Sequence, residues 1–310
     1  MTYIVVGIDG GGSKTHAIVA DPTGRTLGET VGPASAVRPG GADASADVIA
    51  SVVADALTAC GLTGATPRAL AIGVAGIGRD TERQQLWHAL AGRDLASEIV
   101  MQSDFSIALD DAFGDGPGVL ILSGTGSVAF GRGPTGATAR CGGWGPTFGD
   151  EGSGAWIGRR ALTVVAAASD GREPETALTG AILTAAQVDE TIDLIGWAAN
   201  ATPADFASLA PVVASVADSG DLRANAVLTL AVEELVLHAR ALARKLFTDE
   251  RAALPMALTG GMLNRGSTLR KRLEHRLKSA VPGAQLKTEP VIPARGAVRA
   301  ALRVAGAAVV

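Results

Sequence analysis

The sequence contains one arrangement of elements twice, and this repetition constrains the fold more than any other feature. In each copy a short apolar strand runs into a glycine-rich turn, which leads back into a second strand. The two turns are Asp9-Gly-Gly-Gly-Ser13 and Ser123-Gly-Thr-Gly-Ser127. A supersecondary unit that recurs in one chain predicts two domains of the same α/β architecture.

The remaining strands and helices are expected to follow the same order in both copies. Hydrophobic periods and turn residues predict a first copy with elements at Tyr3–Asp9, His16–Ala20, Thr26–Val31, Ala44–Cys60, Ala69–Ala75, Thr81–Leu90 and Glu98–Gln102. The second copy is predicted at Gly118–Leu122, Val128–Gly131, Ala137–Cys141, a helical insertion from about residue 153 to Leu246, Pro255–Thr259, Leu269–Lys278, Gln285–Thr288 and Arg295–Val304. We therefore expect domains at 1–116 and 117–294, with a final helix at 295–310 that packs back on the first domain.

Composition narrows the class of protein. The 310 residues are 47% hydrophobic and 19% charged, which is typical of a globular chain with two domains. A net charge of −4 argues against nucleic acid as the main partner. No apolar stretch is long enough to span a membrane, and the N-terminus is typical of a strand, so a cytoplasmic protein is expected. Cys60 and Cys141 form no clustered motif and are expected to be free thiols.

The first glycine turn has the composition of a phosphate-binding loop. Glycines bring backbone amides close to a ligand, and successive amides form an anion-binding nest. We expect phosphate contacts from Gly11, Gly12, Ser13, Lys14 and Thr15. Asp9, at the end of the preceding strand, would hold Mg²⁺, directly or through water. An ordinary hairpin turn is the alternative.

The second glycine turn is informative mainly together with the first. Gly124, Thr125 and Gly126 fit a loose dinucleotide-binding pattern, but a strand follows them where that pattern needs a helix. A Walker A loop is excluded by the spacing around Lys14. Two such turns, one in each copy, suit the binding of a triphosphate from both sides.

A carboxylate follows the last strand of the first copy. Asp104 comes directly after Ser103, at the strand end that faces ligands in α/β units. Such an aspartate can accept the proton of a hydroxyl during phosphoryl transfer. The sequence equally allows Asp104 to be only the N-cap of a helix at Phe105–Ala112.

The densest motif is Gly142-Gly-Trp-Gly-Pro-Thr-Phe-Gly-Asp-Glu-Gly-Ser-Gly154. Trp144 would lie against the apolar face of a sugar, and Asp150 would accept its hydroxyl protons. In the alternative, Asp150 or Ser153 caps the helix that begins near Ala155, and Trp144 belongs to the core. The same helix N-terminus would also favour phosphate charge. Further on, paired glycines at Gly260 and Gly261 would let an adenine lie flat on the backbone.

These motifs, in this order over nearly the whole chain, resemble the N-acetylglucosamine kinase branch of the BadF/BadG/BcrA/BcrD ATPases. The resemblance implies duplicated ribonuclease H-like domains of the actin and hexokinase type, with a cleft between them. It implies ATP and Mg²⁺ as cofactors. It also implies phosphate contacts by the two glycine loops, adenosine contacts by Gly260 and Gly261, Asp104 as the catalytic base, and sugar contacts by Gly143, Trp144 and Asp150.

Two positions depart from the family pattern. Ser35 stands where relatives often carry an asparagine that touches the sugar, and Ala75 stands where some carry a serine. The resemblance implies a kinase for the 6-hydroxyl of N-acetylglucosamine, with Ser35 at the sugar. Glucosamine and N-acetylmuramic acid are alternative substrates. An ATP-driven activator of a dehydratase or reductase and a non-catalytic sugar sensor are alternative functions. ATP and the amino sugar are the expected partners, and a homodimer is left open.

Overall fold

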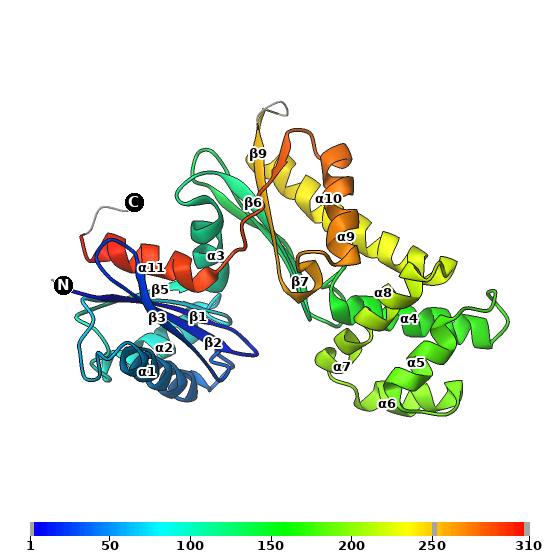
Figure 1. Ribbon diagram of the computed structural model, residues 1–310, viewed down its shortest axis with the longest axis horizontal. Coiled ribbons are helices and arrows are strands. Elements are labelled where there is room, and N and C mark those ends of the chain that lie inside the picture. The colour runs from blue at the N-terminus through cyan, green and yellow to red at the C-terminus, as the bar shows by residue number, and fades with distance from the viewer. Residues whose placement is uncertain (1–2, 250–252, 307–310) are drawn as a thin grey trace. The chain divides into compact units, whose positions relative to one another are not determined.

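The computed structural model describes residues 3–249 and 253–306 and divides into two compact units (Figure 1). The first unit consists of the described residues up to Asp115 together with those from Val291 onward. The second unit is the continuous stretch between them, Gly116–Pro290. The chain therefore leaves the first unit, builds the second and returns to finish the first.

A five-stranded sheet forms the centre of the first unit. Its strands are β1 (Val5–Gly10), β2 (Thr15–Ala20), β3 (Thr26–Gly32), β4 (Ala69–Val74) and β5 (Glu98–Ser103). The spatial order is β3-β2-β1-β4-β5, with β1 antiparallel to β2 and parallel to β4. Because β4 is also parallel to β5, the carboxyl ends of β1, β4 and β5 lie at one edge of the sheet.

Helices cover both faces of this sheet (Figure 1). α1 (Ala42–Ala59) and α2 (Asp80–Ala91) pack on one face, and α3 (Asp104–Phe113) and α11 (Pro293–Val304) pack on the other. Gly7 lets α11 lie directly on β1, since a Cβ atom there would be 2.4 Å from the Val298 nitrogen. Ion pairs of Asp111 with Arg295 and of Asp110 with Arg303 join α11 to α3.

The second unit repeats the sheet. Its strands are β6 (Gly118–Ser123), β7 (Ser127–Arg132), β8 (Thr138–Gly142), β9 (Leu254–Thr259) and β10 (Ala284–Leu286). The order β10-β9-β6-β7-β8 is that of the first sheet counted from the other side, with β6 parallel to β9 and antiparallel to β7. The predicted α/β fold with a duplicated unit is confirmed by this match of strand order.

The helices of the second unit include the predicted insertion between β8 and β9. The insertion contains α4 (Gly154–Ser169), α5 (Leu178–Ala186), η1 (Thr191–Asp193), α6 (Leu194–Asn200), α7 (Pro203–Ser208), α8 (Ala210–Asp218) and the long α9 (Leu222–Leu246). A short η2 (Gly261–Leu263) and α10 (Thr268–Ala280) follow β9. Buried side chains of α9, among them Leu228, Leu235 and Leu242, belong to the hydrophobic core of this unit. Within the described part of the chain, no helix has both the length and the apolar character needed to cross a bilayer.

Candidate active site

Two carboxylates lie at the carboxyl edge of the first sheet. Gly10 of β1 pairs with Val74 of β4, and Val74 pairs with Ser103 of β5, so these three strands end level with one another. Asp9 is one residue before the end of β1, and Asp104 directly follows β5. After burial, the negative charge of Asp104 contributes to the raised pKa of Asp9.

Asp104 is the first residue of α3, and Ser103 is the N-cap. The Ser103 hydroxyl accepts a hydrogen bond from the Ser106 amide at 3.2 Å. The alternative interpretation of Asp104 as the cap is therefore wrong. Burial raises the pKa of the Asp104 carboxyl, although hydrogen bonds from the amides of Phe105 and Asp104 oppose that effect. Among the described residues no cationic side chain forms an ion pair with Asp104, so its carboxylate is available to a substrate.

Asp9 is the more strongly perturbed carboxyl. Burial, and after it the charge of Asp104, raises its pKa to about 6, while His16 and Lys14 act in the opposite direction. Burial disfavours the ionised form of a carboxyl group, and a bound cation stabilises that form. The side chain therefore fits a divalent cation, which prefers oxygen ligands.

The loop between β1 and β2 presents unused backbone amides. The Gly11 amide donates to the Lys14 carbonyl at 2.9 Å and closes the turn. The amides of Gly12, Ser13 and Lys14 donate no hydrogen bond within the described chain, and all three residues are exposed. A Cβ atom at Gly12 would meet nothing within 4 Å. Successive amides of this kind form a nest that suits a phosphate group.

The hydroxyls of Thr15 and Ser35 are used inside the protein. Thr15 Oγ1 lies 2.6 Å from the Pro33 carbonyl oxygen and 2.7 Å from Ser35 Oγ. The two residues are 0% and 1% exposed. This geometry does not support the predicted direct contacts of Thr15 with ATP and of Ser35 with the sugar. Their hydroxyls instead fasten the start of β2 to the 33–35 turn.

The corresponding loop of the second unit, between β6 and β7, is hydrogen-bonded to the start of α4. Its Gly124 amide donates to the Gly126 carbonyl at 2.8 Å, and the Gly154 and Ala155 amides donate to the carbonyls of Gly124 and Thr125. The amides of Thr125 and Gly126 donate no hydrogen bond to any described residue and are available to a phosphate. The amides of Gly154 and Ala155 at the start of α4 therefore already donate to the loop carbonyls. They are not free to bind the phosphate that the sequence predicts at this helix N-terminus.

Two buried serines fix this loop to the segment that carries the predicted sugar residues. Ser123 Oγ donates to the Gly152 carbonyl at 2.9 Å, and Ser127 Oγ donates to the Glu151 carbonyl at 2.6 Å. In the sequence these serines are recognisable only as parts of a turn. Their position on either side of Gly-Thr-Gly is the sequence feature that could indicate that they anchor this loop.

The paired glycines after β9 lie beside the same loop. Gly260 has φ 98°, and a Cβ atom there would lie 2.3 Å from the Ser123 carbonyl oxygen, so the position requires glycine. Gly261 is exposed, and a Cβ atom there would meet nothing within 4 Å. The backbone at Gly261 is therefore open to the flat approach of a ligand.

Asp150 is held in a left-handed conformation, with φ 56°. Its Oδ1 accepts from the Gly145 amide at 3.2 Å, and the Ser127 amide also donates to the carboxylate. Gly126 makes room for it, since a Cβ atom there would lie 2.7 Å from Asp150 Oδ2. Burial raises the pKa of this carboxyl. Ser153, which accepts from the Trp156 amide, caps α4, so Asp150 is not the cap.

Trp144 is on the surface of the second unit. Its side chain is 62% exposed, so its interpretation as a core residue is wrong. The guanidinium of Arg140 lies 5.0 Å from the indole centroid and supports one face of the ring. Gly143 has φ 70°, and a Cβ atom there would lie 2.7 Å from a Val128 methyl group. The chain can thus turn sharply just before it presents the indole.

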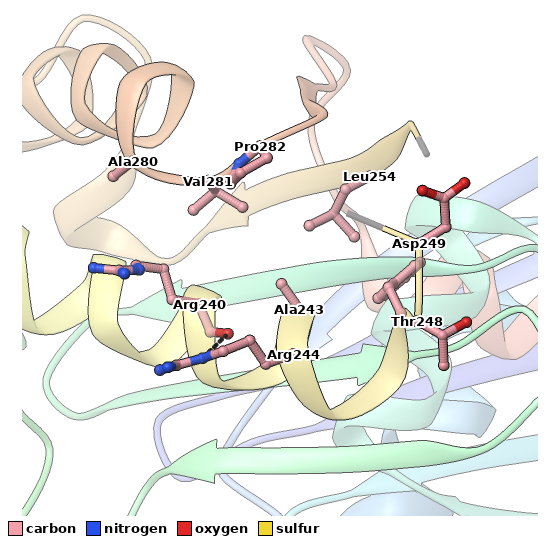
Figure 2. A pocket seen from close by; sticks show the side chains of 10 residues that line it. Arg240, Ala243, Arg244, Thr248, Asp249, Leu254, Ala280, Val281 and Pro282 are labelled. Atoms are coloured by element: carbon pink, nitrogen blue, oxygen red, sulfur yellow. Dashed lines mark hydrogen bonds between the residues drawn. The ribbon is translucent and has the colours of Figure 1, made fainter. Parts of the chain in front are cut away.

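A cavity of about 480 Å³ lies elsewhere in the second unit, among α9, β9 and the end of α10 (Figure 2). Its lining includes Ala243, Leu254 and Val281, with Arg240 and Arg244 at α9. None of the residues singled out from the sequence lines it. Each unit therefore has its own group of candidate residues, in the loops at the edge of its sheet.

Known proteins resemble this chain over most of its length. An N-acetylmuramic acid/N-acetylglucosamine kinase of Clostridium acetobutylicum is 31% identical over 84% of this chain and 85% of its own length. An N-acetyl-D-glucosamine kinase of Dictyostelium discoideum is 31% identical over 96% and 98%. A solved structure from Chromobacterium violaceum, provisionally named an N-acetylglucosamine kinase, is 32% identical over 96% and 98%, with a TM-score of 0.79.

These similarities confirm the duplicated ribonuclease H-like fold of the actin and hexokinase type that the sequence predicted. The model of the BadF/BadG/BcrA/BcrD ATPase family matches residues 6–304, which is nearly the whole chain. The protein described here therefore belongs to the BadF/BadG/BcrA/BcrD ATPase family.

Proposed function

We propose that this protein is an ATP-dependent kinase that phosphorylates the 6-hydroxyl of an amino sugar, and that the sugar is N-acetylglucosamine. The relatives of similar length act, by their names, on N-acetylglucosamine and N-acetylmuramic acid. The single observation that carries the proposal is the half-buried Asp104 carboxylate, which lies at the same edge of the first sheet as Asp9 and has no cationic partner among the described residues.

Asp104 acts as the general base. Its raised pKa strengthens it as a proton acceptor once it is ionised. The carboxylate takes the proton of the sugar hydroxyl while the oxygen forms a bond to the γ-phosphorus of ATP. The bond from that phosphorus to the bridging oxygen breaks, and ADP leaves with the electron pair.

Asp9 holds Mg²⁺ in this proposal, directly or through water. No group of three His, Cys, Asp or Glu side chains in the described chain is arranged to bind a metal by itself. This suits Mg²⁺, which is usually bound by one or two carboxylates together with the phosphates of a nucleotide. When bound, the cation supplies positive charge that stabilises the phosphate oxygens during transfer.

The glycine loops bind the nucleotide. The unused amides of Gly12, Ser13 and Lys14 in the first unit, and those of Thr125 and Gly126 in the second, donate to phosphate oxygens. The Lys14 side chain, exposed beside the first loop, adds a positive charge. Gly11 shapes the first turn and Gly124 the second, while Gly260 and Gly261 accept the adenosine.

The sugar is bound by the loop between β8 and α4. Trp144 offers an exposed aromatic face to the apolar side of the ring. Asp150 accepts hydrogen bonds from sugar hydroxyls, because two amide donors leave a carboxylate with further acceptor capacity. The positive φ of Gly143 places the indole relative to that carboxylate.

A sugar panel tests the proposal. ATP consumption and the phosphorylated product are measured with glucose, glucosamine, N-acetylglucosamine and N-acetylmuramic acid. We expect the highest kcat/KM with N-acetylglucosamine and a 6-phosphate product. A higher kcat/KM for glucose, or no reaction with any of the four sugars, would contradict the assignment.

The same assay separates two alternative functions. A non-catalytic sugar sensor would bind the sugars without consuming ATP. An ATP-driven activator of a dehydratase or reductase would hydrolyse ATP without a sugar and would need clustered thiolates for an iron–sulfur centre. Cys60 and Cys141, one in each unit, are both free, which favours the kinase.

A further inference from the structure

His238 is a buried histidine that the proposed reaction does not use. It belongs to α9 and is 8% exposed. Its imidazole lies against two points of the chain, Gly142 and Glu151, which are the two ends of the segment that contains Trp144 and Asp150. We call the stretch 143–150 the sugar loop.

The first end of the sugar loop is shaped to fit the imidazole. Gly142 has φ 73°, and a Cβ atom there would lie 2.8 Å from His238 Cε1 and 3.0 Å from Nε2. Any larger residue would displace the ring. The chain therefore enters the sugar loop in direct contact with His238.

The second end of the sugar loop meets the same ring and the same helix. Glu151 Oε2 lies 3.6 Å from His238 Nε2. At the next residue, a Cβ atom on Gly152 would lie 2.6 Å from Leu235 Cγ and 2.7 Å from the Ala231 carbonyl oxygen. One face of α9 thus supports the point where the chain leaves the loop.

The histidine and the glutamate have unused hydrogen-bonding capacity. Glu151 Oε2 and His238 Nδ1 are buried atoms without a hydrogen-bond partner. Burial lowers the pKa of His238, while Glu151 and Glu234 oppose this effect. The Nε2 to Oε2 separation of 3.6 Å is slightly longer than a hydrogen bond, so a small movement of the loop end would form one.

A displacement of Glu151 would move Asp150. The Glu151 carbonyl accepts from Ser127 Oγ, and the Ser127 amide donates to the Asp150 carboxylate. The position of the sugar-binding carboxylate therefore depends on where the loop end is held. We propose that His238 is a positioning residue that fixes both ends of the sugar loop and thereby sets the affinity for the sugar; this inference rests on the proposed kinase function.

Three variants test this role. We expect His238→Ala to raise the sugar KM about tenfold, because a misplaced binding group weakens substrate binding, while the KM for ATP and kcat change little. His238→Gln keeps a donor near the position of Nε2 and should recover most of the affinity. His275→Ala, on the exposed surface of α10, is the control and should behave like the parent.

A second measurement does not depend on activity. Chymotrypsin cleaves after aromatic residues, and Trp144 and Phe148 of the sugar loop are 62% and 75% exposed. His238→Ala should be cleaved there several times faster than the parent under native conditions, and His238→Gln should not. Circular dichroism and thermal melting of each variant report whether it folds.

The outcomes separate the positioning role from the proposed function. If the parent phosphorylates no sugar while His238→Ala still loosens the loop, the kinase proposal fails and the positioning of the loop stands. If the parent is an active kinase and His238→Ala leaves the sugar KM and loop cleavage unchanged, the positioning role is overturned. Should His238→Ala not fold, a His238→Gln variant with a raised sugar KM and a raised KM for ATP together would also overturn it.

Discussion

The two sheets have the same strand order, yet the edges where their parallel strands end carry different chemistry. The edge of the first sheet holds two half-buried carboxylates, Asp9 and Asp104, each with a raised pKa. At the position that corresponds to Asp9, the second sheet holds Ser123, whose hydroxyl is spent on the Gly152 carbonyl. One copy thus keeps ionisable groups for a reaction, whereas the other uses its polar groups to hold loops in place.

The loops differ in the same sense. The Gly11 amide closes the Gly11–Lys14 loop on the Lys14 carbonyl, and the Gly11 carbonyl accepts from the amides of Ser35 and Ala36, while Gly12, Ser13 and Lys14 are exposed. The Gly124–Gly126 loop is bonded to α4 and to the Ser123 and Ser127 fastenings. Duplication of the fold therefore supplies two glycine loops, and different neighbours leave the tip of the first exposed and bond the second to α4.

Removal of the reactive carboxylate should have the largest effect. We expect Asp104→Asn to lower kcat by roughly 10²–10⁴-fold, because the amide cannot accept the hydroxyl proton. The melting temperature should stay near that of the parent, since Ser103 and not Asp104 caps α3. Steady-state kinetics and thermal melting measure both effects.

The control for that variant is Asp80→Asn, whose carboxylate is 79% exposed on α2. It should have normal turnover. Near-normal turnover of Asp104→Asn itself would show that the first edge is not the reactive one, and the contrast between the two sheets would fail.

One matched glycine-to-alanine substitution compares the Gly124–Gly126 loop with the Gly11–Lys14 loop. Gly126→Ala places a methyl group 2.7 Å from Asp150 Oδ2, whereas Gly12→Ala places one in open space. We expect Gly126→Ala to lower kcat/KM by about 10²-fold, as a misplacement of about an ångström can. Gly12→Ala should have a much smaller effect. Equal losses for the two variants would show that the loops are constrained alike.

Loss of the Asp150 carboxylate should change the KM for the sugar and not the KM for ATP. We expect Asp150→Ala to raise the sugar KM by about 5–150-fold, which corresponds to the 1–3 kcal/mol that an unmet buried hydrogen bond costs. The KM for ATP should change little. A sugar that lacks the matching hydroxyl should lose affinity on the parent and little more on the variant. A parallel rise in the KM for ATP would mean that Asp150 acts mainly through the neighbouring Gly126.

The last expected effect concerns the pH dependence of stability and not the activity. Because burial raises the pKa of Asp9 from 3.8 to about 6, the ionised group destabilises the folded protein. This penalty is complete above pH 6 and disappears as the pH falls below 4. Asp9→Asn should therefore be more stable than the parent at pH 8 by about 3 kcal/mol, without Mg²⁺, and equal to it near pH 4. Denaturant unfolding at the two pH values measures the difference, and an equal gain at both would contradict it.

The fold could be predicted from the sequence because its signals are local. Strand and helix periods, glycine turns and the repeated order place most elements within a few residues of their observed bounds. The alternative that Asp104 caps α3 misses the N-cap by one residue, since serine caps helices as well as aspartate does. Structure was needed to choose Ser103.

The position of a candidate residue could be predicted only where it depends on the local sequence. Asp104 lies at a strand end that the sequence identifies, and the Trp144 loop is recognisable by composition. The hydroxyls of Thr15 and Ser35 looked available because the sequence does not show that they are each other's partner. For the same reason nothing near His238 in the sequence indicates that it contacts Gly142 and Glu151. Burial and pairing of polar groups depend on contacts between distant segments.

The placement of α11 has a consequence for how the protein is made. This helix supplies Ala297, Val298 and Ala301 to the core on one face of the first sheet, yet it is the last helix of the chain. A ribosome therefore completes the whole of Gly116–Pro290 before that core can close. Synthesis of the first unit starts before that of the second and ends after it. During translation the carboxylates at its sheet edge therefore belong to an incomplete domain, at a time when the second unit already has its whole sequence.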